Sequence, residues 1–96
     1  MTPGFSLHVT SAFRRFAQDL QDRHPEFERR AAEAFAILGE DPYNRSRRHH
    51  VRKLRGGRSG EGEYRLALGR WRFIYDISGQ DVILYYCGLP REDTYR

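Results

Sequence analysis

The sequence predicts a small α+β domain in which an N-terminal strand and a helical hairpin precede a mostly antiparallel four-stranded sheet. Three observations support this fold class. Apolar residues recur with helical spacing in the first half of the chain and at every second position in much of the second half. Glycines separate the alternating segments. The length of 96 residues suits one core, so we expect a single domain over residues 1–96.

The first half is predicted to form one strand and two helices. Residues 5–9 alternate apolar and polar side chains, as a half-buried strand does. Thr10 or Ser11 can cap the first helix, Pro25 fits the first turn of the second, and Gly39 can close it in a left-handed conformation. The apolar stripes of the two helices are Phe13, Phe16, Ala17 and Leu20, and then Phe27, Ala31, Ala34, Phe35 and Leu38.

The second half is predicted to form four strands. Residues 51–55 could make a short one, and the three longer ones are expected near residues 63–68, 71–77 and 82–87. Turns are expected at Gly69-Arg70 and at 78–80. The last strand is apolar throughout, which predicts a central strand covered on both faces.

The alternation also predicts two different sheet faces. Tyr64, Leu66, Leu68, Trp71, Phe73, Tyr75 and Ile77 can bury against the helices. Arg65 and Arg72 point to the opposite face, on adjacent strands where cross-strand neighbours approach about 5 Å. We therefore expect an anionic ligand on the face away from the helices.

Positive charge is concentrated in residues 44–72, which hold ten Lys or Arg and two Glu, whereas the whole chain has a net charge of +4. Arginine, whose planar guanidinium suits bidentate contacts to phosphate, dominates the segment. We expect a surface that binds a polyanion, and single-stranded RNA fits better than a duplex groove because no recognition helix is visible. The alternative is a solvated basic face without a partner. The RNA-binding candidates are Arg45, Arg47, Arg48, His49, His50, Arg52, Lys53 and Arg55.

Cysteine count and hydropathy exclude several classes of protein. Cys87 is the single cysteine, so neither an intrachain disulfide nor a multi-cysteine zinc module can form, and we expect it to be a core thiol. No further ligands stand at useful spacing from His49 and His50, so we expect no metal and no cofactor. No apolar run approaches the roughly 20 residues of a membrane span, and no signal peptide is visible. We expect a cytoplasmic protein that does not enter a membrane.

Cleavage of RNA without a metal would need more than binding. It requires a base, an acid for the leaving oxygen and cations for the transition state, and arginine supplies only the last of these at neutral pH. The groups near the basic segment that can transfer protons are His49, His50, Glu63, Tyr64 and Tyr95.

Several short motifs follow one another in the second half of the chain. They are Lys53-Leu54-Arg55-Gly56, Glu63-Tyr64-Arg65-Leu66, Trp71-Arg72-Phe73-Ile74-Tyr75 and the terminal stretch from Gly88 to Tyr95. Taken in this order, the motifs resemble the RelE/ParE superfamily of bacterial type II toxins. Each motif is loose alone, but their order and spacing are specific, and the resemblance runs from about Phe5 to Arg96.

For the RelE-like branch, the resemblance implies a metal-independent endoribonuclease that cleaves mRNA on the ribosome and is bound by a cognate antitoxin. It implies that Arg65 acts on the nucleophile side, Arg72 stabilises the phosphate and Arg55 contacts RNA. Arg91 and Tyr95 match a terminal arginine and a tyrosine that stacks on or orients the nucleotide. The implied catalytic set is Arg65, Arg72, Arg91 and Tyr95.

Two departures from the family pattern bear on the chemistry. Ala67 stands where some members have a second lysine, and Leu89-Pro90 stands where many have a candidate general acid. Either His49, His50 or Arg91 substitutes for that acid, or nuclease activity is weak. The alternative from the same superfamily is a ParE-like toxin that inhibits DNA gyrase without cleaving RNA. A third reading is a member that survives only as a binding module.

Overall fold

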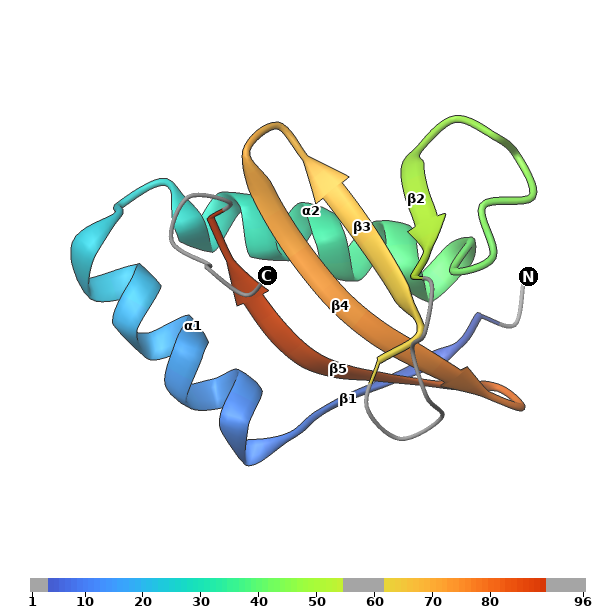
Figure 1. Ribbon diagram of the computed structural model, residues 1–96, viewed down its shortest axis with the longest axis horizontal. Helices are drawn as coiled ribbons and strands as arrows, with labels where there is room; N and C mark the ends of the chain where they lie inside the picture. The colour runs from blue at the N-terminus through green and yellow to red at the C-terminus, as the bar shows by residue number, and fades with distance from the viewer. Residues whose placement is uncertain (1–3, 55–61, 90–96) are drawn as a thin grey trace.

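The computed structural model is a five-stranded mixed sheet with two helices, and it describes residues 4–54 and 62–89 (Figure 1). The elements are β1 (Ser6–Val9), α1 (Ser11–Arg23), α2 (Phe27–Glu40), β2 (His50–Lys53), β3 (Tyr64–Leu68), β4 (Trp71–Ser78) and β5 (Asp81–Gly88). The strand order is β1-β5-β4-β3-β2, with β1 parallel to β5 and the other neighbours antiparallel. The predicted α+β fold class is confirmed, and the N-terminal strand joins the four others as an edge strand of the same sheet.

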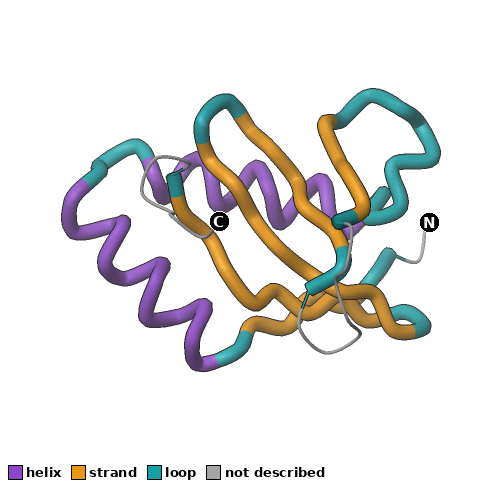
Figure 2. Tube along the Cα trace, viewed as in Figure 1, coloured by secondary structure: helices purple, strands orange, loops and turns teal. Residues whose placement is uncertain are grey.

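One face of the sheet packs on α2, which runs behind β3 and β4 in Figures 1 and 2. The core between these two layers includes Phe27, Ala34 and Leu38 from α2, and Leu66, Phe73, Tyr75, Val82 and Leu84 from the sheet. Helix α1 packs instead beside β5. β1 pairs only with residues 81–84, so α1 occupies the flank of β5 beyond the end of β1. The opposite face of β2, β3 and β4, called the open face below, has no helix of the described chain over it.

The helix boundaries differ from the prediction at two places. Thr10 caps α1 as expected, because its Oγ1 accepts the Phe13 N–H at 3.0 Å. However, α2 begins only at Phe27, after Pro25, and Gly39 lies within its last turn with no positive φ. The helix ends at Glu40, because its C-cap Asp41 has a φ of −145° and the proline that follows cannot continue the helix. None of the described helices has the length and apolar character to cross a membrane.

Turn and bulge geometry sets the faces of β4 and β5. Gly69 and Gly79 both have φ of 61° at the first central position of two-residue turns, which fits the turn type that hairpins prefer. β5 pairs with β4 through Ile74↔Tyr86 and then Tyr75↔Leu84, so the strand carries one extra residue, Tyr85. The bulge turns Tyr86 to the open face, whereas simple alternation from Leu84 would have placed it against α2.

The bulge and the open face limit the burial of β5. The strand lies inside the sheet between β1 and β4, as predicted. Ile83, Tyr85 and Tyr86 are nevertheless only half-buried, so the prediction that both faces of this strand are covered is wrong. Cys87 is buried as expected, and burial raises the pKa of its thiol to about 12.

Candidate nucleic-acid interface

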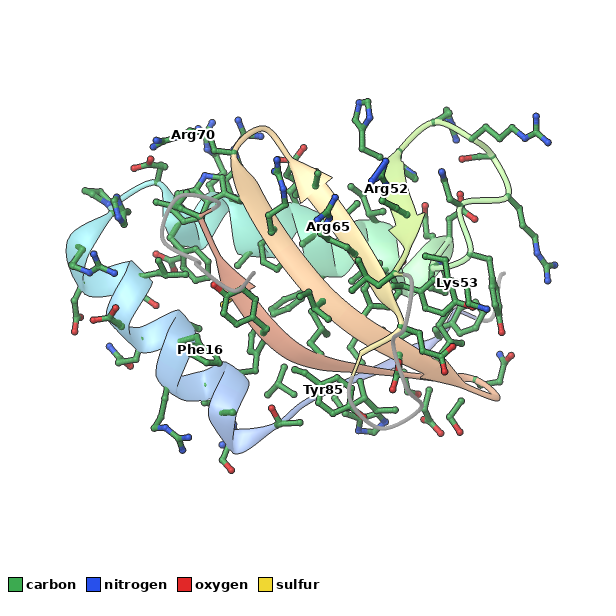
Figure 3. All side chains as sticks on the ribbon, in the orientation of Figure 1. Phe16, Arg52, Lys53, Arg65, Arg70 and Tyr85 are labelled. Atoms are coloured by element: carbon green, nitrogen blue, oxygen red, sulfur yellow. The ribbon has the colours of Figure 1, made fainter. Side chains whose placement is uncertain are left out.

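A row of four side chains crosses the open face at right angles to the strands. The register places Arg52 of β2 opposite Arg65 of β3, Arg65 opposite Ile74 of β4, and Ile74 opposite Tyr86 of β5. Figure 3 shows Arg52 and Arg65 side by side on the face turned away from α2. The row is therefore cationic at the β2 side and apolar at the β5 side.

A second row runs parallel to the first, one pleat further along. It consists of His50, Ala67, Arg72 and Gly88, each directly opposite the next. Arg72 and Arg65 thus share the open face as predicted, but they are not direct cross-strand neighbours. They stand on the diagonal, where Cα separations are about 7–8 Å, rather than in the predicted contact of about 5 Å. Together the rows bring His50, Arg52, Arg65 and Arg72 onto one surface.

The Arg72 guanidinium is held by the turn that precedes it. Its Nη1 donates to the Gly69 carbonyl at 2.8 Å and to the Trp71 carbonyl at 3.2 Å. An arginine has five N–H donors, so two bonds through one nitrogen leave it able to bind an anion as well. This anchoring lowers the entropy that the side chain loses when a phosphate binds.

Arg52 and Arg65 line a shallow cleft of about 330 Å³ together with Lys53 and Leu54. Two like charges directly opposite each other repel, and in a sheet such a pair is destabilising. A bound polyanion would remove that repulsion. Binding of a phosphate in this cleft is therefore favoured by the positive charge of Arg52 and Arg65.

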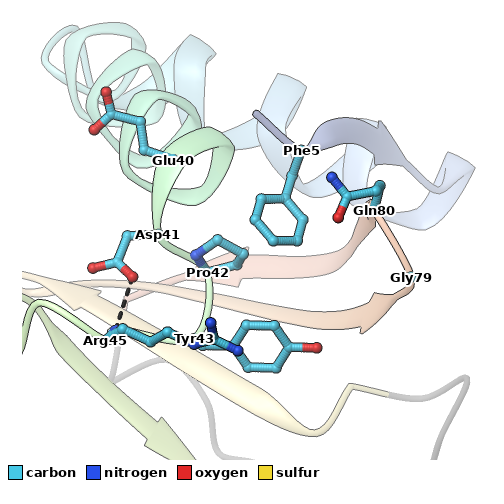
Figure 4. A pocket seen from close by; sticks show the side chains of 8 residues that line it. All are labelled: Phe5, Glu40, Asp41, Pro42, Tyr43, Arg45, Gly79 and Gln80. Atoms are coloured by element: carbon cyan, nitrogen blue, oxygen red, sulfur yellow. Dashed lines mark hydrogen bonds between the residues drawn. The ribbon is translucent and has the colours of Figure 1, made fainter. Parts of the chain in front are cut away.

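The loop between α2 and β2 carries three further cations, Arg45, Arg47 and Arg48, all exposed. The Asp41 carboxylate accepts the backbone N–H of Arg45 at 2.8 Å (Figure 4). The same carboxylate accepts the Ser46 hydroxyl at 2.7 Å. Burial opposes ionisation of Asp41, but these hydrogen bonds and the nearby His49 outweigh it and lower its pKa.

Asn44 closes the same loop. Its side chain donates to the His49 carbonyl at 2.9 Å and accepts the His49 N–H at 3.1 Å, and its own backbone has φ of 57°. Left-handed backbone is tolerated by asparagine better than by most residues. His49 is half-buried, with its imidazole 4.0 Å from the Asp41 carboxylate, so it belongs to the loop rather than to the open face.

The side chains of Lys53 and Tyr64 lie on the other side of the sheet, although Lys53 also borders the cleft beside Arg52. The Lys53 ammonium stands 5.9 Å from the centroid of the Tyr64 ring, and that ring stacks on Tyr75 and meets Tyr43 edge-on. The arrangement excludes Tyr64 as a proton donor on the open face. The predicted RNA-binding residues of β2 therefore do not share one face of the sheet. His50 and Arg52 lie on the open face, and the Lys53 side chain lies on the opposite face.

Asp76 ties the start of β3 to the open face of β4. Asp76 is 6% exposed, and its carboxylate accepts the backbone N–H groups of Glu63 at 2.6 Å and Gly62 at 3.3 Å. Burial, the charge of Asp76 and a hydrogen bond to it raise the pKa of the Tyr85 hydroxyl. This cluster supports the chain just before Arg65.

Three predicted site residues, Arg55, Arg91 and Tyr95, lie outside the part of the chain that the structure describes, so their roles stay predictions. Two aromatic residues on the open side were missed. Phe16, expected in the core, is 40% exposed, and its ring meets Tyr86 at 4.8 Å between centroids. The helical spacing of Phe16 predicted a buried side chain. The face of the sheet on which Tyr86 lies depends on the bulge at Tyr85, which the sequence pattern does not show. Residues 4–54 and 62–89 contain no group of three His, Cys, Asp or Glu that could hold a metal ion.

Layers and strand order together define an α+β domain whose open face is cationic. In the structure of the RelBE2 toxin–antitoxin complex from Mycobacterium tuberculosis, a chain 20% identical to this one superposes with a TM-score of 0.69, over 91% of this chain and 99% of that one. The archaeal RelE–RelB complex from Pyrococcus horikoshii contains a chain 23% identical, with a TM-score of 0.66 over 93% and 98%. No protein-family model and no curated protein sequence matches significantly. The resemblance to RelE toxins is thus confirmed at the level of the fold.

Proposed function

We propose that this protein is the toxin of a type II toxin–antitoxin pair and that it cleaves mRNA on the ribosome in the cytoplasm. The observation that carries the proposal is the row in which Arg52 and Arg65 face each other beside Arg72 on the open face of a RelE-like sheet. Rigid strands hold these cations before any ligand arrives, which favours binding of a phosphodiester backbone. A cognate antitoxin is the expected protein partner, because the two similar structures described above are both toxin–antitoxin complexes.

The proposed chemistry uses the RNA's own 2′-hydroxyl. Its oxygen attacks the adjacent phosphorus and loses its proton to a base, while the P–O bond to the 5′-oxygen breaks and that oxygen takes a proton from an acid. The products are a 2′,3′-cyclic phosphate and a 5′-hydroxyl. Arg65 and Arg72 would stabilise the negative charge that develops on the phosphate oxygens. Neither can serve as the base, since a guanidinium keeps its proton at neutral pH.

His50 is the proton-transfer group that we favour over His49. It is exposed, and it lies in the same open-face row as Arg72. General acid–base catalysis contributes typically 10²–10⁴-fold. We therefore expect His50→Gln to slow cleavage at least about a hundredfold while leaving RNA binding largely intact.

Induced expression in bacteria tests the proposal. We expect growth arrest with new in-frame 5′ ends in translated mRNA, mapped by primer extension. Arg72→Ala should abolish both without unfolding the protein, and Arg29→Ala, which removes an exposed charge from α2, should abolish neither. Arrest without new mRNA ends but with cleaved DNA–gyrase complexes would contradict RNA cleavage and support the gyrase-directed alternative.

A further inference from the structure

Phe16, which is exposed, and Tyr86, which is half-buried, form an aromatic edge beside the cationic rows. Phe16 is 40% exposed although its neighbours in the α1 stripe, Phe13 and Leu20, are buried at 3% and 4%. Its ring meets that of Tyr86 at 69°, in edge-to-face contact. The contact joins α1 to the open face of β5, at the end of the row that continues through Ile74 to Arg65.

Gly88 makes room for this arrangement. A Cβ at Gly88 would collide with the Tyr86 hydroxyl and lie within 2.8 Å of Tyr86 Cζ. The Tyr86 ring therefore lies across Gly88, and Gly88 is directly opposite Arg72. The fold brings the aromatic edge next to one arginine of the second row and, by the strand spacing, about 10 Å from Arg65 on the first.

We propose that Phe16 and Tyr86 are a stacking site for one nucleobase of the RNA whose phosphate binds at Arg65 and Arg72. The inference rests on the proposed function, because it assumes RNA on the open face. Charge and shape select the occupant. The arginines favour a polyanion, and the exposed Phe16 ring beside the half-buried Tyr86 favours one with flat apolar faces. Single-stranded nucleic acid joins both features, and base stacking on aromatic side chains is tolerant of sequence.

Fluorescence anisotropy with two labelled probes tests the site. One is a 2′-O-methyl RNA of about ten nucleotides, which binds but cannot be cleaved, and the other is an abasic strand with the same number of phosphates. We expect Phe16→Ala to weaken RNA binding about tenfold and to leave the abasic strand unaffected, because stacking contributes only when bases are present. Phe16→Trp should restore RNA binding, and Phe16→Leu, which keeps the apolar bulk, should not.

Tyr43 provides the matched control. It is the other exposed large aromatic residue of the described chain, at 43%, and it packs with Phe5 and Tyr64 rather than on the open face. Tyr43→Ala should leave RNA binding within about twofold. Unfolding midpoints of all variants identify any loss that comes from misfolding.

The outcomes separate the stacking site from the proposed function. If the wild type binds RNA with strong salt dependence but Phe16→Ala binds equally well, the stacking site is wrong and the proposed function stands. If the wild type binds neither probe even at low salt, both are wrong. If Phe16→Ala leaves RNA binding unchanged and turns a dimer into a monomer in sedimentation, the aromatic edge is a contact between copies, which also overturns the site.

Discussion

Arg52 of β2 and Arg65 of β3 lie directly opposite each other on the open face. Like charges in this position lower stability, by an amount comparable to the roughly 0.2–1 kcal/mol of a favourable pair. A protein selected for stability alone would not keep this pair. The arrangement is understandable if both side chains serve a polyanionic ligand that is absent during folding.

The first prediction is that Arg65→Gln stabilises the free protein and weakens RNA binding. Removing the repulsion should raise the free energy of unfolding by up to about 1 kcal/mol in urea titrations at low salt. Losing one phosphate contact should also make the slope of log K against log salt shallower by about 0.7. Arg29→Gln on α2 changes the net charge equally and should alter neither quantity. A destabilised Arg65→Gln would show that the guanidinium makes a favourable contact that outweighs the repulsion.

The second prediction concerns the loop that carries Arg45, Arg47 and Arg48. The Tyr75 hydroxyl is buried and donates to the Pro42 carbonyl at 2.7 Å, which joins β4 to the start of this loop. Tyr75→Phe leaves the Pro42 carbonyl buried without this donor, so we expect a loss of about 1–3 kcal/mol in urea unfolding. Tyr43→Phe, at an exposed ring, should change stability by less than about 0.5 kcal/mol. An equal effect of the two substitutions would mean that water replaces the Tyr75 hydroxyl.

The helices and strands could be predicted because their signals are local. Apolar spacing, the Thr10 cap and the turns at Gly69 and Gly79 each lie within a few residues of the element that they define. The diagonal placement of Arg65 and Arg72 was also within reach, because a two-residue turn at Gly69-Arg70 fixes Leu68 opposite Trp71 and hence Arg65 opposite Ile74.

Other features of the site depend on contacts that the sequence does not encode locally. The pairing of Arg52 with Arg65 spans residues 54–63, a connection that is too long in sequence for a two-residue turn to fix the register. The Tyr85 bulge is hidden inside a continuous apolar run. Phe16 has the spacing of a core residue, and its exposure follows only from the position of α1 beside β5 rather than over the sheet.

The third prediction concerns the anchor of β3. Asp76 accepts two backbone N–H groups, with the shorter bond from Glu63 at 2.6 Å. Asp76→Ala leaves these buried or half-buried donors without the carboxylate, so it should cost about 1–3 kcal/mol or more, since the acceptor is charged. We expect the Glu63 amide to exchange with solvent faster in native-state hydrogen exchange. Tyr85→Phe, which removes one donor to the same carboxylate, should cost less. A larger loss of stability from Tyr85→Phe than from Asp76→Ala would mean that the Tyr85 hydroxyl, and not the Asp76 carboxylate, holds the start of β3 in place.

The last prediction concerns alkaline pH and Cys87. Burial raises the pKa of this thiol to about 12, whereas an unfolded cysteine titrates near 9. As pH rises through that lower value, the unfolded chain loses the proton and the folded chain keeps it. The stability that the neutral thiol contributes is therefore lost progressively above pH 9.

Cys87→Ala removes this dependence, although the smaller side chain lowers stability at every pH. Between pH 8 and pH 10 we expect the wild type to lose about 1.4 kcal/mol more than Cys87→Ala, as the unfolded thiol ionises. The two proteins are compared by how steeply the free energy of unfolding, measured by urea titration, falls between pH 8 and pH 10. The cavity that Cys87→Ala leaves lowers this free energy by the same amount at both pH values, so it does not affect the comparison. The buried Tyr75 and the raised pKa of Tyr85 add a further loss above pH 10 in both proteins. Parallel curves below pH 10 would mean that the Cys87 thiol ionises in the folded state, and that β5 opens to solvent beside Arg72.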